Sequence, residues 1–255
     1  MQIAIITKLI NNTKFKIDKG DHLLDTHTHI LWNIDDGSKN QCMSLQMLEI
    51  AARSGTKAIF ATPHVIERAN KPSWEEIKEK TQQLRQLCAE AQIDIMLYPG
   101  AEVQMNWELL PELGAAGAYC LNGGRYLLVE LPAAEIPAYA DEFWYELELK
   151  GITPILAHPE RYQQLRENPD LLLLWRRRGM LMQCNSGSFT GMFGSSVCEN
   201  AKVLLANGLV DLLGSDGHRS EGRNTDMSRA AAVIRQLAGE EVLRQMTETN
   251  PQAIL

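Results

Sequence analysis

The stretch LDTHTHILWNIDDG, residues 24–37, places two histidines at the end of a short apolar run and two aspartates in the loop that follows. The run has the length of a strand, and residues two apart on a strand point to the same side, so His27 and His29 can bind one ion. The chain has only six histidines, so a pair at the end of one apolar run raises the question of which residues end the other apolar runs.

Seven apolar, β-branched runs of strand length occur along the chain, and the segments between them are mostly long enough for a helix. The runs are HLLDTH, TKAIFATPH, IDIMLYPGAE, RYLLVELP, ITPILAHPE, MLMQCNS and LVDLLGSD. This alternation predicts an α/β fold in which helices cover a parallel sheet. The regular spacing of about 30 residues fits a closed barrel.

Helix signals stand between the runs. Ser73 and Glu76 form a capping box before an amphipathic segment, and Ser196 pairs with Glu199 in the same way, so we expect a helix at each pair. The connection over residues 103–124 is the least regular. We expect a long loop there, with at most a short helix.

The 255 residues are 45% hydrophobic and can bury one core of α/β-barrel size. We expect one domain over residues 21–255, after an N-terminal extension over residues 1–20.

The five cysteines have neither paired nor zinc-finger spacing, which indicates reduced thiols. No signal peptide or transmembrane run is recognisable, so we expect a cytoplasmic protein without membrane insertion. The net charge of −7 disfavours nucleic-acid binding.

The carboxyl ends of nearly all predicted strands carry an imidazole or a carboxylate. These residues are His27, His29, His64, Glu102, Glu130, His158, Asp216 and His218. In a barrel of parallel strands these ends converge on one face, and buried charges without counter-ions are costly. A cluster of divalent metals explains the pattern, with Asp36 as a further ligand from the loop. Asp25 and Asp35 are not assigned as ligands, and Asp25, which shares the face of the histidines, is a candidate for orienting an imidazole.

The chemistry of such a site follows from its ligands and from the arginines nearby. Nitrogen and oxygen ligands without thiolate suit manganese, iron or zinc and do not select among them. Arg161 follows His158 by three residues, and Arg219 and Arg223 follow the last ligand. Guanidinium groups beside a metal cluster indicate that the substrate carries a phosphate.

The ordered set DTHTHIL…DDG, TPH, GAEV, YLLVELP, LAHPERY and GSDGH resembles the polymerase and histidinol phosphatase (PHP) superfamily. Within it, the set resembles the manganese-dependent protein-tyrosine phosphatases of bacterial capsule and exopolysaccharide operons (CpsB/CapC-like). The resemblance covers residues 21–230 and implies a distorted seven-stranded (β/α)7 barrel of the PHP type with three Mn²⁺ ions. The extension before Asp21 departs from the family pattern.

The resemblance also implies how each ion is held. Carried over position by position, the first ion has the ligands His27, His29, Glu102 and Asp216, the second Asp36, His64 and His218, and the third Glu102, Glu130 and His158. Glu102 would bridge two ions, and Arg161 and Arg223 fall where the family holds phosphate. The implied activity is hydrolysis of phosphotyrosine by attack of a metal-bound hydroxide. The implied substrate is the tyrosine-rich tail of a bacterial tyrosine kinase that controls polysaccharide export.

Other classes of enzyme fit the sequence less well. A cysteine-based tyrosine phosphatase needs an arginine six residues after its cysteine, and none of the five cysteines has one. The G-x-S-x-G motif of many serine hydrolases is missing. An amidohydrolase commonly bridges its metals through a modified lysine, whereas this chain supplies glutamates. A metal-binding module without catalysis would not need the arginines. A PHP phosphatase that acts on a small phosphoester such as histidinol phosphate shares nearly all the ligands and is the alternative.

Overall fold

The computed structural model describes residues 22–255, and the predicted extension over residues 1–20 lies outside the described residues. Within that range the strands form two parallel sheets with the orders β1-β2-β4 and β3-β5-β6-β7-β8-β9. Their bounds are β1 (Leu23–Thr28), β2 (Thr56–Ala61), β3 (His64–Val65), β4 (Met96–Pro99), β5 (Glu102–Gln104), β6 (Tyr126–Glu130), β7 (Thr153–Ala157), β8 (Leu181–Asn185) and β9 (Leu212–Gly214).

Each of the seven predicted runs contains a strand, and two of the runs are broken. The run TKAIFATPH is divided into β2 and β3 at Pro63, which has no N–H group for the sheet. The run IDIMLYPGAE is divided into β4 and β5 after Gly100, where a Cβ atom would lie 2.6 Å from the Leu121 side chain. The described residues therefore hold nine strands instead of seven.

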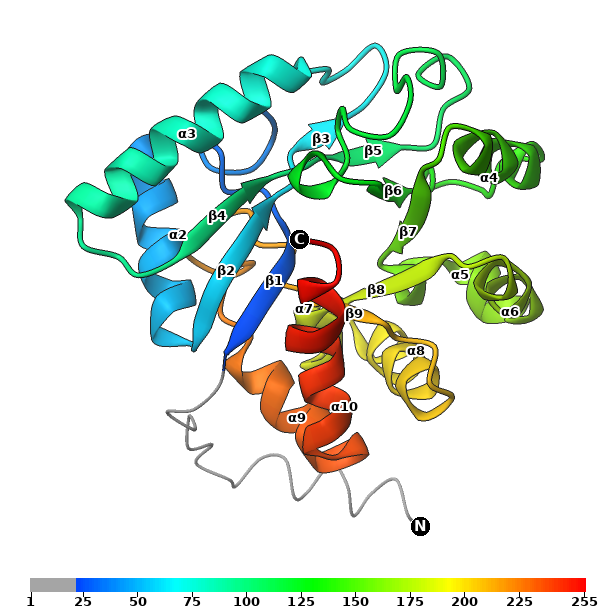
Figure 1. Ribbon diagram of the computed structural model, residues 1–255. Coiled ribbons are helices and arrows are strands. Elements are labelled where there is room, and N and C mark those ends of the chain that lie inside the picture. Colours follow the sequence, from blue (N-terminus) through cyan, green and yellow to red (C-terminus); the bar gives the residue numbers. More distant parts are fainter. Residues whose placement is uncertain (1–21) are drawn as a thin grey trace.

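The two sheets form one curled surface (Figure 1). The amide of Gly100 donates to the Ala61 carbonyl, and the amide of Glu102 donates to the Pro63 carbonyl, so pairing continues across both breaks. At the other edge, the amide of His29 donates to the Gly217 carbonyl at 2.9 Å. The segment after β9 therefore lies beside the end of β1, and the sheet curls back on its first strand.

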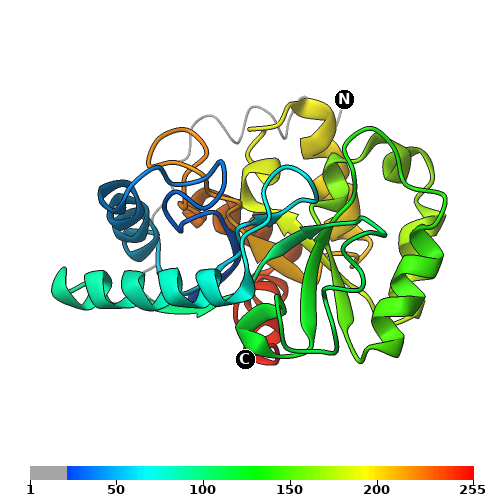
Figure 2. The same cartoon turned by 90° about the horizontal axis from the view of Figure 1, so that it is seen from above.

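The longer helices lie outside the curled sheet, and the last helical turns of the chain lie at one end of it, against β1 and β9 (Figures 1 and 2). The longer ones are α2 (Gln41–Arg53), α3 (Trp74–Glu90), α4 (Ala140–Leu149), α6 (Asp170–Arg177), α8 (Ser195–Ala206) and α9 (Ser228–Ala238). The shorter ones are η1 (Leu121–Gly123), η2 (Pro159–Arg161), α5 (Gln163–Glu167), α7 (Ser186–Phe189), α10 (Glu240–Arg244), η3 (Gln245–Thr249) and α11 (Asn250–Gln252). None of the helices within residues 22–255 is long and apolar enough to cross a bilayer.

The sequence predicted one helix cap correctly and one incorrectly. The Ser73 hydroxyl accepts a hydrogen bond from the Glu76 amide at 3.1 Å, so Ser73 is confirmed as the N-cap of α3. The second is wrong, because α8 has Gly194 as its N-cap and Ser196 lies inside the helix. The hydroxyl of Ser196 instead accepts a hydrogen bond from Arg166. The predicted long loop after β5 is confirmed, since it contains only η1.

A small apolar cluster fills the interior of the curl. Its buried members are Phe60, Leu121, Leu128, Ile155, Ala157, Leu212 and Ile254. Ile254 comes from the segment after α11, and its carbonyl lies beside Gly124, just before β6. Residues from near the end of the described chain therefore cover one end of the curl and leave the carboxyl ends of the strands for polar residues.

Candidate metal centre

The imidazoles and carboxylates predicted at the strand ends lie together at the carboxyl side of the sheet, and Asp36 joins them from the loop after β1. This cluster comprises His27, His29, Asp36, His64, Glu102, Glu130, His158, Asp216 and His218. Six of the nine are buried, namely His27, His29, Glu102, His158, Asp216 and His218. The structure therefore brings together every candidate metal ligand that the sequence suggested.

Glu102, the first residue of β5, lies at the middle of the cluster. Its Oε2 atom lies 3.2 Å from Nε2 of His27, 3.3 Å from Nε2 of His29 and 3.0 Å from Nδ1 of His64. Its Oε1 atom lies 2.9 Å from Nε2 of His158. A carboxylate whose two oxygens face different imidazoles has the geometry to bridge two metal ions.

Asp216, just after β9, faces His27 at the end of β1 and His29 directly after it. Its Oδ1 atom lies 3.5 Å from Nε2 of His27 and 3.4 Å from Nε2 of His29. Ligand atoms of these three residues all lie within 4.8 Å of one another. With Glu102, they form the set that the resemblance assigns to the first ion.

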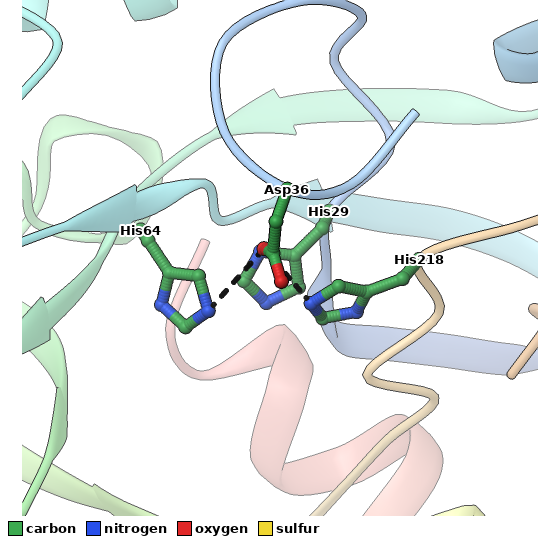
Figure 3. Close-up of side chains that lie close together, drawn as sticks. All are labelled: His29, Asp36, His64 and His218. Atoms are coloured by element: carbon green, nitrogen blue, oxygen red, sulfur yellow. Dashed lines mark ion pairs between the residues drawn. The ribbon is translucent and has the colours of Figure 1, made fainter. Parts of the chain in front are cut away.

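Asp36 has a group of three imidazoles around it (Figure 3). Its Oδ1 atom lies 3.3 Å from Nε2 of His218 and 3.7 Å from Nε2 of His64, and His29 lies between these rings. This is the set expected for the second ion, with His29 added to it.

Two of the residues expected around the third ion, Glu130 and His158, contact other members of the cluster. Oε1 of Glu130 lies 3.3 Å from Nδ1 of His64, and ligand atoms of His64, Glu102 and Glu130 lie within 4.8 Å of one another. His158 instead contacts Glu102. Glu102 therefore lies between the other two expected ligands of this ion.

Several buried polar atoms of the cluster have no hydrogen-bond partner within the described residues. They are Oε2 of Glu102, Oδ1 of Asp216, Nδ1 of His64, Nε2 of His218 and Nδ1 of His158. Buried polar atoms are costly unless they are satisfied by a partner, a water or an ion. Nitrogen and oxygen atoms directed at a shared space fit divalent cations.

The electrostatics of the cluster favour cations. Burial raises the pKa of Glu102 and of Asp216, but the charge of His27 and the other imidazoles nearby together outweigh it and hold both well below the usual range. Burial lowers the pKa of His64, yet Glu102 and its neighbours raise it to about 10. Burial lowers the pKa of His218 to about 4, which leaves this imidazole neutral and able to bind a metal.

Residues 23–255 match the family described as Capsular polysaccharide synthesis, CpsB/CapC. The chain belongs to this family. It is 33% identical over 226 residues to the tyrosine-protein phosphatase YwqE of Bacillus subtilis (strain 168), and the match covers 89% of each chain. It is 27% identical over 238 residues to the tyrosine-protein phosphatase CpsB of Streptococcus pneumoniae, covering 91% of this chain and 98% of that one.

The CpsB/CapC chain is also similar to solved structures. It matches a chain from the crystal structures of YwqE from Bacillus subtilis and CpsB from Streptococcus pneumoniae, which are called unique metal-dependent tyrosine phosphatases. The TM-score is 0.85 at 32% identity, over 91% of this chain and 94% of that one. Histidinol phosphate phosphatase from Lactococcus lactis shares the fold at a TM-score of 0.56 and 17% identity, over 86% of this chain and 94% of that one.

Two members of the cluster have a left-handed backbone conformation in this CpsB/CapC chain. His158 has a φ of 36° and Asp216 a φ of 52°, and each directly follows a strand or its end. Such a conformation costs about 1–3 kcal/mol in a residue that is not glycine. In both cases the turn directs the side chain toward Glu102 or the histidines of β1.

Arg161 and Arg223 lie beside the cluster, as the sequence suggested. Nη1 of Arg161 lies 3.3 Å from Oδ2 of Asp216, and Nη2 of Arg223 contacts the same oxygen. The two side chains are 34% and 29% exposed, so each guanidinium remains accessible to a ligand from solvent. Arg219 differs, because its guanidinium donates to the backbone carbonyls of Asp36 and Gly37. Arg219 therefore fixes the loop that carries Asp36.

Asp25, a candidate for orienting an imidazole, instead contacts the backbone. Its Oδ1 atom accepts hydrogen bonds from the amides of Ser215 and His27, at 2.8 Å and 3.2 Å, so it joins β1 to the end of β9. Burial raises its pKa to about 6. The imidazole of His27 is held instead by Gln183, whose Oε1 atom lies 3.0 Å from Nδ1 of that ring.

The sequence reasoning missed Gln183 and Asn185, two fully buried residues of β8. The side-chain amide of Asn185 donates to Oδ2 of Asp216 at 2.6 Å, and Gln183 donates to Asn185. Amides are not typical metal ligands, so a search for imidazoles and carboxylates passes over them. The available signal was two polar residues at alternate positions near the end of the run MLMQCNS.

Proposed function

We propose that this chain is a metal-dependent protein-tyrosine phosphatase that hydrolyses phosphotyrosine on protein. The observation that carries the proposal is a cluster of nine metal-ligand side chains beside Arg161 and Arg223, both directed at Asp216. Guanidinium groups next to divalent ions form a site for a phosphate dianion. The similarity to YwqE and CpsB supports tyrosine as the phosphorylated residue.

We further propose that three Mn²⁺ ions occupy the cluster, in the three ligand sets implied by the sequence, within a domain that spans residues 21–255. The buried atoms of Glu102, Asp216 and His218 that lack a hydrogen-bond partner within the described residues support this assignment. The divalent ions would lower the pKa of a water molecule and neutralise charge on the phosphate. We also assign the fold to the distorted seven-stranded PHP barrel, since each broken run occupies a single position in the curled sheet.

The two arginines would act on the phosphate, and the leaving group would depart without a strong general acid. Arg161 and Arg223 would bind non-bridging oxygens and stabilise the charge that spreads over them during in-line displacement. Tyrosine has a pKa of about 10, so phenolate leaves more easily than the alkoxide of serine. A site without a strong general acid at the leaving oxygen would therefore favour phosphotyrosine.

We infer that the partner is a bacterial tyrosine kinase of polysaccharide synthesis, dephosphorylated on its tyrosine-rich tail. The family description, which refers to capsular polysaccharide synthesis, supports this inference. We place the enzyme in the cytoplasm, because its five described cysteines are free thiols.

The decisive experiment is a substrate panel. The Mn²⁺-loaded enzyme is assayed with a phosphotyrosine peptide, the matching phosphoserine peptide and histidinol phosphate, and kcat/KM is compared. We expect the phosphotyrosine peptide to be the best substrate by at least an order of magnitude. A clear preference for histidinol phosphate would contradict the proposal and support the small-molecule alternative. A second experiment tests the metal requirement. We expect activity to be lost after chelation and to be recovered with Mn²⁺ in preference to Zn²⁺ or Fe²⁺.

A further inference from the structure

Phe193 contacts both arginines of the metal centre. The central guanidinium carbon of Arg161 lies 4.8 Å from the centroid of the Phe193 ring, and that of Arg223 lies 5.6 Å from it. The arginines follow β7 and β9, whereas Phe193 follows β8, the strand between them. One aromatic ring therefore connects the two cationic side chains.

The loop that carries Phe193, between α7 and α8, holds the ring in a defined place. Gly191 and Gly194 flank it with φ values of 83° and 94°, in the left-handed region that favours glycine. The amide of Met192 donates to the Gly187 carbonyl at 3.0 Å. A Cβ atom on Gly187 would lie only 3.2 Å from Cε2 of Phe193, so the ring packs directly against that glycine.

The two guanidinium groups need such a support. Both point at Oδ2 of Asp216, which brings two like charges close together, and Asn185 donates to the same oxygen. Arginine side chains also lose conformational freedom when they are fixed. The negative face of an aromatic ring attracts a guanidinium, which offsets both costs at separations below about 6 Å.

We propose that Phe193 is a positioning residue for phosphate binding, which holds Arg161 and Arg223 at the spacing that grips the non-bridging oxygens. The inference rests on the proposed phosphatase function. Phe193 acts through the arginines, so its contribution is the same for every phosphomonoester, whatever the leaving group.

The test compares Phe193→Leu, which keeps an apolar side chain without a ring, with Phe193→Tyr, which keeps the ring. Binding of inorganic phosphate to the Mn²⁺-loaded enzyme is measured by calorimetry, and metal content and melting temperature are recorded for each variant. We expect Phe193→Leu to weaken phosphate binding about fivefold, the effect of losing one to two cation–π contacts. Phe193→Tyr should restore it. Met192→Leu, on the exposed neighbour, is the matched control for the loop.

Kinetics separate positioning from a general defect in folding. Phe193→Leu should raise KM equally for p-nitrophenyl phosphate and for an alkyl phosphate, with metal content and melting temperature unchanged. Unchanged phosphate affinity in Phe193→Leu would overturn the inference. So would a loss confined to the aryl substrate, because that result indicates direct contact with the leaving group. If the wild type binds phosphate but hydrolyses no phosphomonoester, the proposed function fails while the calorimetric test of Phe193 still stands.

Discussion

Asp35 orients His29: its Oδ2 atom accepts a hydrogen bond from Nδ1 of the imidazole at 2.7 Å. The same carboxylate accepts hydrogen bonds from the amides of His64 and Gly37, at 3.0 Å and 2.9 Å. Burial raises the pKa of Asp35, but the charge of His29 and the hydrogen bonds that the carboxylate accepts together outweigh it, and the net shift is downward. One ionised side chain thus fixes the imidazole that follows β1 and the backbone of a second histidine.

We expect Asp35→Asn to lower Mn²⁺ affinity by about 10–100-fold, as loss of an orienting carboxylate typically does. The asparagine has nearly the same shape but lacks the charge that attracts the imidazole N–H. Affinity is measured by competition with a fluorescent chelator. Asp94→Asn, at an exposed aspartate paired with Lys57, is the control. Equal affinity in both variants would show that Asp35 does not support the metal site.

Glu102→Gln should remove activity and more than one metal ion per chain. The side chain contacts four imidazoles through both oxygens, and an amide cannot bridge two cations. Metal content is measured by inductively coupled plasma mass spectrometry, and folding by circular dichroism. Glu108→Gln changes a surface glutamate paired with Arg68 and should have no effect. Full metal stoichiometry in Glu102→Gln would rule out a bridging role.

Metal binding should release protons and strengthen as the pH rises from 6 to 8. Nearby carboxylates raise the pKa of His27 and of His29 against the effect of burial, and that of His64 to about 10. A raised pKa means that the metal-free imidazole is protonated at neutral pH, and a ligand must be deprotonated. Calorimetry in two buffers of different ionisation enthalpy gives the number of protons released. A value of zero would contradict this prediction.

Arg161→Ala should weaken phosphate binding and lower kcat/KM by about 30-fold, since a charge-assisted contact is worth on the order of 2 kcal/mol. The metals should stay bound, because Arg161 contacts Asp216 only through the oxygen that does not face the histidines. Inhibition by inorganic phosphate measures the loss. Arg166→Ala, which removes a nearby arginine that contacts Ser196, is the control. Wild-type inhibition in Arg161→Ala would exclude the arginine from the phosphate site.

The sequence was informative wherever a polar residue ended an apolar run. His29, Glu102 and His158 could be placed from their position alone, because the carboxyl ends of parallel strands meet on one face. Roles that depend on side-chain direction could not be placed in this way. Arg219 and Arg223 lie four residues apart in one loop, yet only the second turns toward Asp216.

The breaks within the second and third predicted strands could not be predicted from the sequence for a related reason. Pro63 interrupts hydrogen bonding, but nothing in the run shows that a second strand resumes at once beyond it. Gly100 is required by the approach of the Leu121 side chain, which lies far along the chain. Both features depend on tertiary neighbours that a local pattern does not contain.

The curling of β9 back onto β1 determines when the site can exist during synthesis. His27 and His29 leave the ribosome early, whereas Asp216 and His218 follow almost 190 residues later, and the Gly217 carbonyl must then reach the His29 amide. A nascent chain that stops before β9 therefore presents two exposed imidazoles without the partners that complete their ligand set. We therefore expect the complete ligand set to form only after β9 has been synthesised and the sheet has closed on β1.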